Sequence, residues 1–214
     1  MTTDVLVAEQ LEKHFGHHLL WHIENLVLKS GDTIHLRGEN GSGKTTLLKV
    51  LAGLQKADKG NVLINKQPVM LGGKVCYLHQ QPYMFDRSVR SNLALALASR
   101  QGSSKEKQHQ LEEALHWSGL AKQAEQAART LSGGERQALA MARAWLCKPS
   151  FWLLDEPTAS LDEKGVQKCV ELVRNLRDAG AAILLTTHQK GELTDICDQT
   201  WWMQEGRLRT ESID

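Results

Sequence analysis

The fold is decided by residues 38–46, which read Gly38-Glu39-Asn40-Gly41-Ser42-Gly43-Lys44-Thr45-Thr46. The glycines allow backbone N–H groups to approach phosphate oxygens closely, because no Cβ stands in the way. A strand is predicted to end just before this stretch and a helix to begin within it, so that the helix N-terminus faces the same anion. In that context the pattern indicates a phosphate-binding loop rather than a glycine turn followed by a surface lysine.

Two side chains of this loop carry specific chemistry. Lys44 is expected to reach the β- and γ-phosphates as a point charge. The hydroxyl of Thr45 is expected to bind Mg²⁺. Further phosphate contacts are predicted for the other loop residues, Gly38, Asn40, Gly41, Ser42, Gly43 and Thr46.

A second motif follows an apolar run at residues 151–154, where Asp155 and Glu156 stand side by side. Asp155, at the tip of the predicted strand, can bind Mg²⁺ directly or through water. Glu156 can orient or deprotonate an attacking water. Taken alone, such a pair also fits a solvated strand end. Together with the phosphate-binding loop it predicts a site that hydrolyses nucleotide.

A third motif, Leu-Ser-Gly-Gly-Glu-Arg-Gln at residues 131–137, precedes an alanine-rich helical stretch. Ser132 can cap that helix, and Gly133 and Gly134 keep its N-terminus open to an anion. One nucleotide site needs only one phosphate-binding loop. A second phosphate-recognition surface therefore suggests that nucleotide is sandwiched between two copies of the chain, each lending its helix end to the other.

The order of the predicted elements indicates an α/β fold with a mostly parallel sheet, because strands alternate with helices. Strands are predicted at residues 33–37, 74–78, 151–154 and 182–186, and helices at 44–53, 104–118, 133–146 and 163–179. The first 30 residues instead predict an antiparallel sheet, with short strands at 5–9, 19–21 and 24–28.

A compositional block beginning at residue 88 is rich in Ala, Gln, Leu, Lys and Glu. We interpret it as a helical insert with Ser104 as a helix cap. Together with the helix after the third motif, the insert spans about residues 88–147 of a single domain at 1–214.

Composition excludes several classes of protein. The 26 Lys and Arg nearly balance the 25 Asp and Glu, so the charge gives no case for a nucleic-acid partner. No run of 18 apolar residues predicts a membrane span, and the first residues do not resemble a secretion signal. The four cysteines lack zinc-ribbon spacing. The histidines at 14, 17, 18 and 22 are interpreted as an exposed turn between strands rather than a metal site.

These motifs and their order resemble the ATPase subunit of an ABC transporter, and the resemblance covers nearly the whole chain. It implies a P-loop NTPase fold that binds and hydrolyses ATP with Mg²⁺. Residues 38–46 resemble Walker A, Asp155 with Glu156 resembles Walker B with the catalytic glutamate, and residues 131–137 resemble the signature motif. The catalytic residues implied are Lys44, Glu156 and His188.

The resemblance also assigns single residues outside these motifs. Phe15 resembles the aromatic residue that stacks on adenine, although an aromatic beside a turn can equally belong to the core. Gln80 resembles the Q-loop glutamine that contacts Mg²⁺, and Gln81 competes with it for that role. Asp162 resembles the D-loop aspartate at the dimer interface, and it can also cap the helix that follows it. His188 resembles the switch histidine near the γ-phosphate.

The partners implied are a second copy in a head-to-tail ATP sandwich, a separate transmembrane permease and a periplasmic solute-binding protein. The location implied is the cytoplasmic face of the cytoplasmic membrane. The apolar residues Tyr83, Met84, Phe85 and Val89 follow Gln80 and are candidates to grip a permease helix, or are ordinary packing of a loop. The stretch from Gly60 to Gln80 is short, so a trimmed antiparallel lobe is expected.

The resemblance favours an importer of tungstate- or molybdate-type oxyanions. Heme, metal, lipid and small-peptide transport remain open. The alternative class is an ABC ATPase of DNA repair or translation, but such relatives generally carry a long coiled-coil insert, zinc modules or two cassettes.

Overall fold

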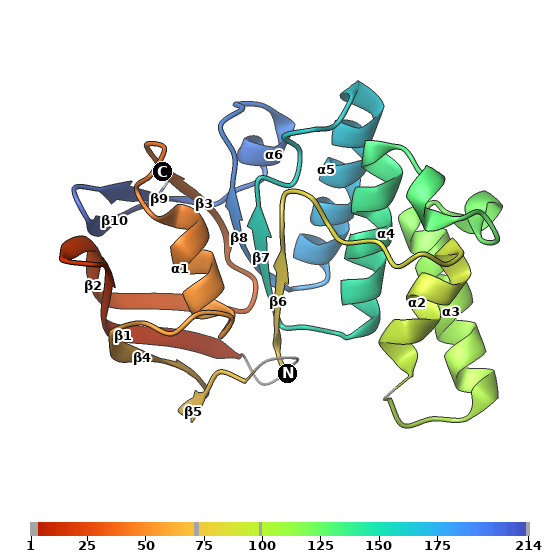
Figure 1. Ribbon diagram of the computed structural model, residues 1–214, viewed down its shortest axis with the longest axis horizontal. Coiled ribbons are helices and arrows are strands. Elements are labelled where there is room, and N and C mark those ends of the chain that lie inside the picture. The colour runs from red at the N-terminus through yellow and green to blue at the C-terminus, as the bar shows by residue number, and fades with distance from the viewer. Residues whose placement is uncertain (1–3, 71–72, 99, 213–214) are drawn as a thin grey trace.

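The computed structural model describes residues 4–70, 73–98 and 100–212, and its strands form two sheets (Figure 1). The central sheet has six strands in the order β10-β9-β3-β8-β7-β6. Its strands are β3 (Thr33–Gly38), β6 (Val75–Leu78), β7 (Phe151–Asp155), β8 (Ala182–Thr186), β9 (Gln199–Gln204) and β10 (Arg207–Ser212). All neighbours in this sheet are parallel except β9 and β10. The mostly parallel sheet predicted from the sequence is thus confirmed.

The adjacent apolar strands β7 and β8 are buried along their whole length. Successive side chains of β7 point to opposite faces of the sheet. Phe151 and Leu153 pack in one core cluster with α1 (Lys44–Leu51) and the antiparallel sheet. Trp152 and Leu154 pack in a second cluster with α4 (Gly133–Leu146) and α5 (Glu163–Asp178). A strand covered on both faces reads as a continuous apolar run, which is why the sequence revealed it.

The antiparallel sheet, on the left of Figure 1, has the strand order β2-β1-β4-β5. The expectation of three short strands in the first 30 residues was wrong. A single hairpin is formed by β1 (Val5–Phe15) and β2 (His18–Lys29). The break expected near residues 22–23 is absent because those residues stay paired with β1, as Glu12↔His22 and Leu11↔Ile23. Two further strands, β4 (Lys59–Ile64) and β5 (Gln67–Pro68), complete this sheet.

The helical insert lies at the opposite end of the molecule, on the right of Figure 1. It consists of α2 (Val89–Leu97), α3 (Ser104–Ser118) and two short 3₁₀ turns, Ala121–Gln123 and Ala128–Thr130, and leads into α4. The predicted cap Ser104 was wrong, since the cap is Ser103. The hydroxyl of Ser103 accepts from the N–H of Glu106, whose carboxylate accepts from the N–H of Ser103. This reciprocal pair is a capping box, which needs Glu three residues after the cap.

The histidine-rich turn shows no cluster of metal ligands among the described residues. His14 and His22 instead face single carboxylates, with Nδ1 3.8 Å from Asp58 and 3.4 Å from Glu12.

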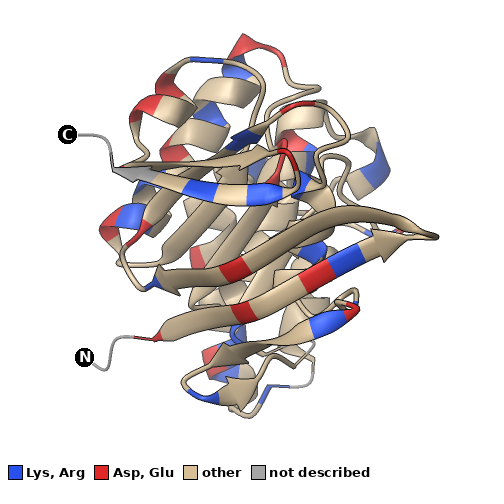
Figure 2. Ribbon diagram, turned by 90° about the vertical axis from the view of Figure 1, so that its left-hand side faces the viewer, with Lys and Arg blue, Asp and Glu red and all other residues tan. Residues whose placement is uncertain are grey.

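Charges of both signs are interspersed over the side formed by the antiparallel sheet and the β9–β10 hairpin (Figure 2). None of the helices in the described part of the chain combines the length and apolar character needed to cross a bilayer. The short α6 (Glu192–Asp195) completes the list of helices.

Candidate functional site

The phosphate-binding loop joins β3 to α1, as its sequence predicted. Gly41 and Gly43 have φ of 82° and 93°, a region that strongly favours glycine. A Cβ on Gly43 would lie 2.6 Å from the indole of Trp21, so the loop rests directly on the β1–β2 hairpin. No side chain caps the first turn of α1. Its N–H groups are therefore available to an anion.

Lys44, the first residue of α1, extends back over the loop. Its Nζ donates to the carbonyl oxygens of Gly38 at 2.7 Å and Glu39 at 2.9 Å. Burial lowers the pKa of Lys44, while the nearby carboxylates of Glu156 and Asp155 raise it. The ammonium is thus held inside the loop, where a phosphate group would provide stronger partners than two carbonyls.

Asp155, at the tip of β7, is almost fully buried and receives three hydrogen bonds. Oδ1 accepts from the hydroxyls of Thr45 and Thr186, each at 3.0 Å. Oδ2 accepts from the hydroxyl of Tyr77 at 2.8 Å. Sequence reasoning missed Thr186 and Tyr77. The only sequence signal was that each residue follows apolar residues of a predicted strand. Parallel strands end at the same edge of a sheet, so residues near those ends can meet.

Glu156 follows Asp155 in a left-handed backbone conformation, with φ of 50°. That conformation costs a non-glycine residue free energy and persists only where the surroundings enforce it. Here its N–H donates to the Thr186 hydroxyl at 2.9 Å. The turn brings the Glu156 carboxylate to 3.3 Å from Nε2 of His188, on the loop after β8. Two residues distant in the sequence are therefore neighbours at the end of the sheet.

His35, on β3, supports the loop that carries His188. Its Nε2 lies 3.1 Å from the carbonyl oxygen of Thr187, and because a carbonyl only accepts, that nitrogen carries the proton. Burial lowers the pKa of His35 below its ordinary value of 6.5, the nearby cations act in the same direction, and the bond to Thr187 opposes them. The folded protein therefore favours neutral His35.

We expect the free energy of unfolding to decrease as the pH falls below about 6.5. The unfolded chain binds a proton at His35 more readily than the folded one, so the contribution of His35 is complete above that pH and is lost below it. Chemical denaturation between pH 5 and 8 measures this slope. His35→Gln should flatten it, while His109→Gln on the exposed face of α3 should not. Equal slopes in all three proteins would contradict the role of His35.

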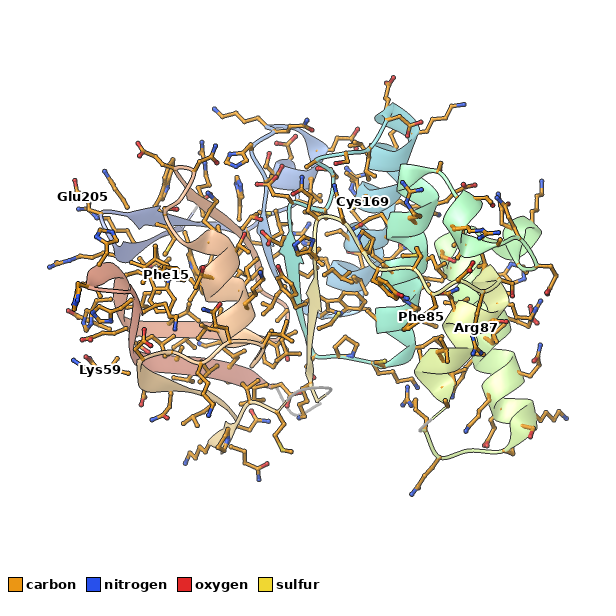
Figure 3. The ribbon with its side chains drawn as sticks, in the orientation of Figure 1. Phe15, Lys59, Phe85, Arg87, Cys169 and Glu205 are labelled. Carbon is orange, nitrogen blue, oxygen red and sulfur yellow. The ribbon has the colours of Figure 1, made fainter. Side chains whose placement is uncertain are left out.

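One cavity of about 390 Å³ brings most of the predicted site together. It unites the phosphate-binding loop, the two carboxylates and two residues that only the resemblance assigned. Its lining residues are Phe15, Leu20, Asn40, Gly41, Gly43, Lys44, Thr45, Thr46, Asp155, Glu156 and His188. Phe15 is 56% exposed, so the alternative of a core residue was wrong. Figure 3 shows Phe15 beside α1.

The remaining predicted site residues lie elsewhere. Gln80 is exposed just beyond the end of β6 and does not line this cavity. Ser132, Gly134 and Asp162 line a separate cavity of about 270 Å³, which shares no lining residue with the first. Gly133 adjoins the D-loop, since a Cβ on it would lie 3.2 Å from the carbonyl oxygen of Ser160. Within a single chain, the two groups of predicted site residues therefore do not meet.

The second cavity is built on the N-termini of α4 and α5. The hydroxyl of Ser132 accepts from the N–H of Glu135 at 3.2 Å, and Asp162 accepts from the N–H of Gly165 at 2.9 Å, so both predicted caps are confirmed. A Cβ on Gly134 would lie 2.6 Å from the Cα of Gly165. Gly134 thus allows the two helices to approach closely, a packing role beside any contact with an anion.

We expect Gly134→Ala to destabilise the fold by about 1–3 kcal/mol, because the added methyl overpacks the α4–α5 contact. Thermal unfolding measures this loss. Gly133→Ala is the matched control, since its methyl meets a carbonyl oxygen at 3.2 Å and a small shift relieves it. If the two variants unfold at the same temperature as the wild type, the packing role of Gly134 is wrong.

Comparisons with known proteins show what this chain is similar to. Residues 22–159 match the family model described as ABC transporter. The chain is 32% identical over 207 residues to the tungstate uptake system ATP-binding protein of Peptoclostridium acidaminophilum, covering 95% of this chain and 96% of that one. It is 34% identical over 214 residues to the sulfate/thiosulfate import ATP-binding protein of Neisseria meningitidis, covering 95% of this chain and 60% of that one.

Similarity extends to export proteins and to solved structures. The chain is 32% identical over 215 residues to the lipopolysaccharide export system ATP-binding protein of Escherichia coli, covering 95% of this chain and 88% of that one. A solved ATP-binding cassette, a dimer in a post-hydrolysis state with ADP and phosphate, superposes with a TM-score of 0.85 at 24% identity. That match covers 98% of this chain and 99% of the solved one, and at this identity it supports the fold.

Proposed function

Because this chain belongs to the ABC transporter family and is an ATP-binding and ATP-hydrolysing subunit, we propose that it drives import of a tungstate-, molybdate- or sulfate-type oxyanion through a separate permease. The observation that carries the import proposal is the match to a tungstate uptake protein over nearly the full length of both chains. The match to a sulfate/thiosulfate import protein supports the same class of cargo. Export is the competing direction, since a lipopolysaccharide export protein is equally similar. We further propose that residues 1–214 form one ABC ATPase domain with its helical insert at about 88–147.

We propose that ATP binds in the 390 Å³ cavity, with its phosphates on the loop at residues 38–46 and its adenine on the exposed ring of Phe15. The N–H groups of the uncapped α1 would donate to the phosphate oxygens. Lys44 would exchange its two carbonyl partners for the β- and γ-phosphates.

The residues at the tip of β7 fit a magnesium ion. Mg²⁺ prefers hard oxygen donors, and the Thr45 hydroxyl lies 3.0 Å from a carboxylate oxygen of Asp155. These two residues would hold the ion, with Gln80 reaching in from the end of the neighbouring strand β6. When bound, Mg²⁺ neutralises charge on the β- and γ-phosphates.

Glu156 and His188 are the proposed hydrolytic pair. Glu156 would orient the water that attacks the γ-phosphate in line and accept its proton. The imidazole of His188, whose Nε2 lies 3.3 Å from that carboxylate, would donate to the transferring phosphoryl group. Catalysis of this kind depends on positioning and electrostatics, and it requires bulk solvent, other than the attacking water, to be excluded from an otherwise open cavity.

A second copy would close that cavity. Since the half-site at Ser132, Gly133, Gly134 and Asp162 does not meet the cavity of its own chain, we propose that it completes the partner's cavity in a head-to-tail dimer. Such a dimer buries two ATP molecules between two equivalent surfaces, as two-fold symmetry requires.

The proposed contact with the permease lies just after Gln80. Tyr83 and Phe85 are 72% and 41% exposed, and their rings meet edge to face at 5.3 Å. Val89, also expected there, is completely buried in the core of the insert, so its expected contact was wrong. Met84 is partly buried against the same core. The surface formed by Tyr83 and Phe85 is thus small and aromatic, which suits an anchor for a helix.

This surface is bonded to α4, which begins at the signature motif, and to α2 of the helical insert. Arg143, on α4, donates to the carbonyl oxygen of Tyr83 at 2.6 Å, and its guanidinium lies 5.4 Å from the Phe85 ring centre. The side chain of Asn92, on α2, both accepts from the N–H of Phe85 and donates to its carbonyl at 3.1 Å. Because Ser132 caps the same α4, a displacement of Tyr83 would be passed to the signature motif.

We place the assembly at the cytoplasmic face of the cytoplasmic membrane, held there by the permease, with a periplasmic solute-binding protein on the other side and no nucleic-acid partner. The test is to co-express the chain with a permease encoded by a neighbouring gene and to reconstitute the complex in vesicles. ATP-dependent uptake of tungstate, molybdate and sulfate is then measured. We expect concentrative uptake of at least one oxyanion and stimulation of hydrolysis by the loaded binding protein. Outward movement of lipid, or no oxyanion uptake, would contradict the proposed cargo.

A further inference from the structure

The hydroxyl of Tyr77 is the only described donor to Oδ2 of Asp155, among the hydrogen bonds of residues 4–70, 73–98 and 100–212. The other two donors, Thr45 and Thr186, both reach Oδ1. Asp155 is 4% exposed, so most of its hydrogen bonding is with protein groups. A buried carboxylate oxygen without a donor is costly, which gives this one hydroxyl a large influence on the orientation of the carboxylate.

The position of the Tyr77 hydroxyl is fixed by its strand. Tyr77 pairs in register with Leu153 of β7, so its side chain reaches along the sheet to the residue at the strand tip. Its ring packs against the core cluster beneath α1 and lies edge to face with His79, with ring centres 6.3 Å apart. A phenylalanine would keep the packing and lose only the donor.

The three hydrogen bonds hold Asp155 in one orientation before any ion arrives. Mg²⁺ demands near-ideal octahedral geometry, so the orientation of each ligand affects its affinity. Residues that orient metal ligands are known to matter nearly as much as the ligands themselves. The Thr45 hydroxyl can donate to Asp155 and offer its own lone pair to the ion at the same time, which leaves Tyr77 as the partner on the opposite oxygen.

We propose that Tyr77 is a positioning residue for the magnesium site, which fixes the Asp155 carboxylate and ties it to strand β6. This rests on the proposed function, because it requires the magnesium site at Thr45 and Asp155. The same strand leads through Gln80 to the surface formed by Tyr83 and Phe85. A shift of β6 imposed at that surface would therefore reach the metal ligand through a single hydrogen bond.

The test compares Tyr77→Phe with the wild-type protein. We expect the Mg²⁺ or Mn²⁺ concentration that half-saturates binding of a non-hydrolysable ATP analogue to rise about 10- to 100-fold, the usual range for loss of a residue that orients a metal ligand. Affinity for the analogue in EDTA should stay unchanged. The half-saturating Mg²⁺ concentration for hydrolysis should rise in parallel, with recovery of the maximal rate at high Mg²⁺.

The control is Thr33→Val, which removes a buried hydroxyl for which no partner is found among the described residues, at the start of β3 and far from the loop. It should leave the Mg²⁺ dependence as in wild type. If Tyr77→Phe leaves it within twofold of wild type, Tyr77 has no positioning role, although the magnesium site stands. If wild-type binding shows no Mg²⁺ dependence, the magnesium site itself is wrong.

A second measurement uses the unaltered protein and does not depend on the folding of a variant. The chain has only two tyrosines, so ¹³Cζ-tyrosine labelling gives two resolved NMR lines. The Tyr77 line should shift when Mg²⁺ is added to the complex with the ATP analogue, while the line of exposed Tyr83 should not. A Tyr77 line that stays unmoved at saturating Mg²⁺ would overturn the proposal.

Discussion

Replacing Glu156 by glutamine is expected to reduce steady-state ATP hydrolysis by about 10²- to 10⁴-fold, because an amide cannot accept the proton of the attacking water. Glutamine has nearly the same shape as glutamate. The backbone turn, held by the N–H bond to Thr186, should therefore remain intact. ATP binding should persist, and a dimer with trapped ATP should accumulate. Phosphate release and size-exclusion chromatography with ATP measure the two effects.

Glu163→Gln is the matched control, since Glu163 begins α5 on an exposed face and lies outside the cavity. It should retain wild-type hydrolysis. If Glu156→Gln keeps its rate within threefold of wild type, Glu156 is not the catalytic base. A variant that also loses ATP binding would instead indicate that the substitution disturbed the loop, and the thermal stability would reveal it.

Replacing Ser132 by arginine is expected to abolish hydrolysis while ATP binding to the same chain is retained. Ser132 lines the second cavity, so a large cation there would block closure on the partner's nucleotide without touching the first cavity. Ser132 is a better target than Gly134, because any Cβ at Gly134 strains the contact with Gly165 and confuses loss of activity with loss of fold. Nucleotide binding and hydrolysis are measured on the same preparation.

Mixing two inactive variants provides the sharpest test of the sandwich. Lys44→Ala disables the first half-site and Ser132→Arg the second. In a mixed dimer, the loop of the Ser132→Arg chain faces the intact helix of the Lys44→Ala chain. Random mixing should therefore restore about a quarter of the wild-type rate, since half the dimers are mixed and each has one complete site. If the mixture stays as inactive as its components, the two half-sites are not shared between chains.

Much of the site was readable from the sequence because its chemistry is contiguous. The loop at residues 38–46 combines backbone conformation, a lysine and a hydroxyl within nine residues, and neighbouring strand and helix signals support it. The caps Ser132 and Asp162 were equally local, because a capping hydrogen bond spans only three residues. The cap at Ser103 was missed by one position, although the glutamate that identifies it lay three residues ahead.

Strands without a continuous apolar run were harder to predict. Strands β4 and β9 and the edge strand β10 contain polar residues because part of their surface faces solvent. None of them was predicted. The long hairpin β1–β2 was divided wrongly because the polar residue His22 interrupts its apolar pattern where the chain stays paired with Glu12. Pairing with a neighbour, rather than local composition, holds these segments extended.

The sequence by itself determined a glycine-rich loop between a strand and a helix and two carboxylates at the end of a buried strand, and from these it predicted a site for nucleotide phosphates. Only the tertiary structure decided how those carboxylates are held. Tyr77 and Thr186 reach Asp155 through the register of parallel strands, and Glu156 meets His188 across the end of the sheet. The packing of the helices also buries Val89, which was expected at the surface, and places Gly134 in close contact with Gly165. Local patterns specify backbone conformation, whereas contacts between distant segments depend on how the strands and helices pack together.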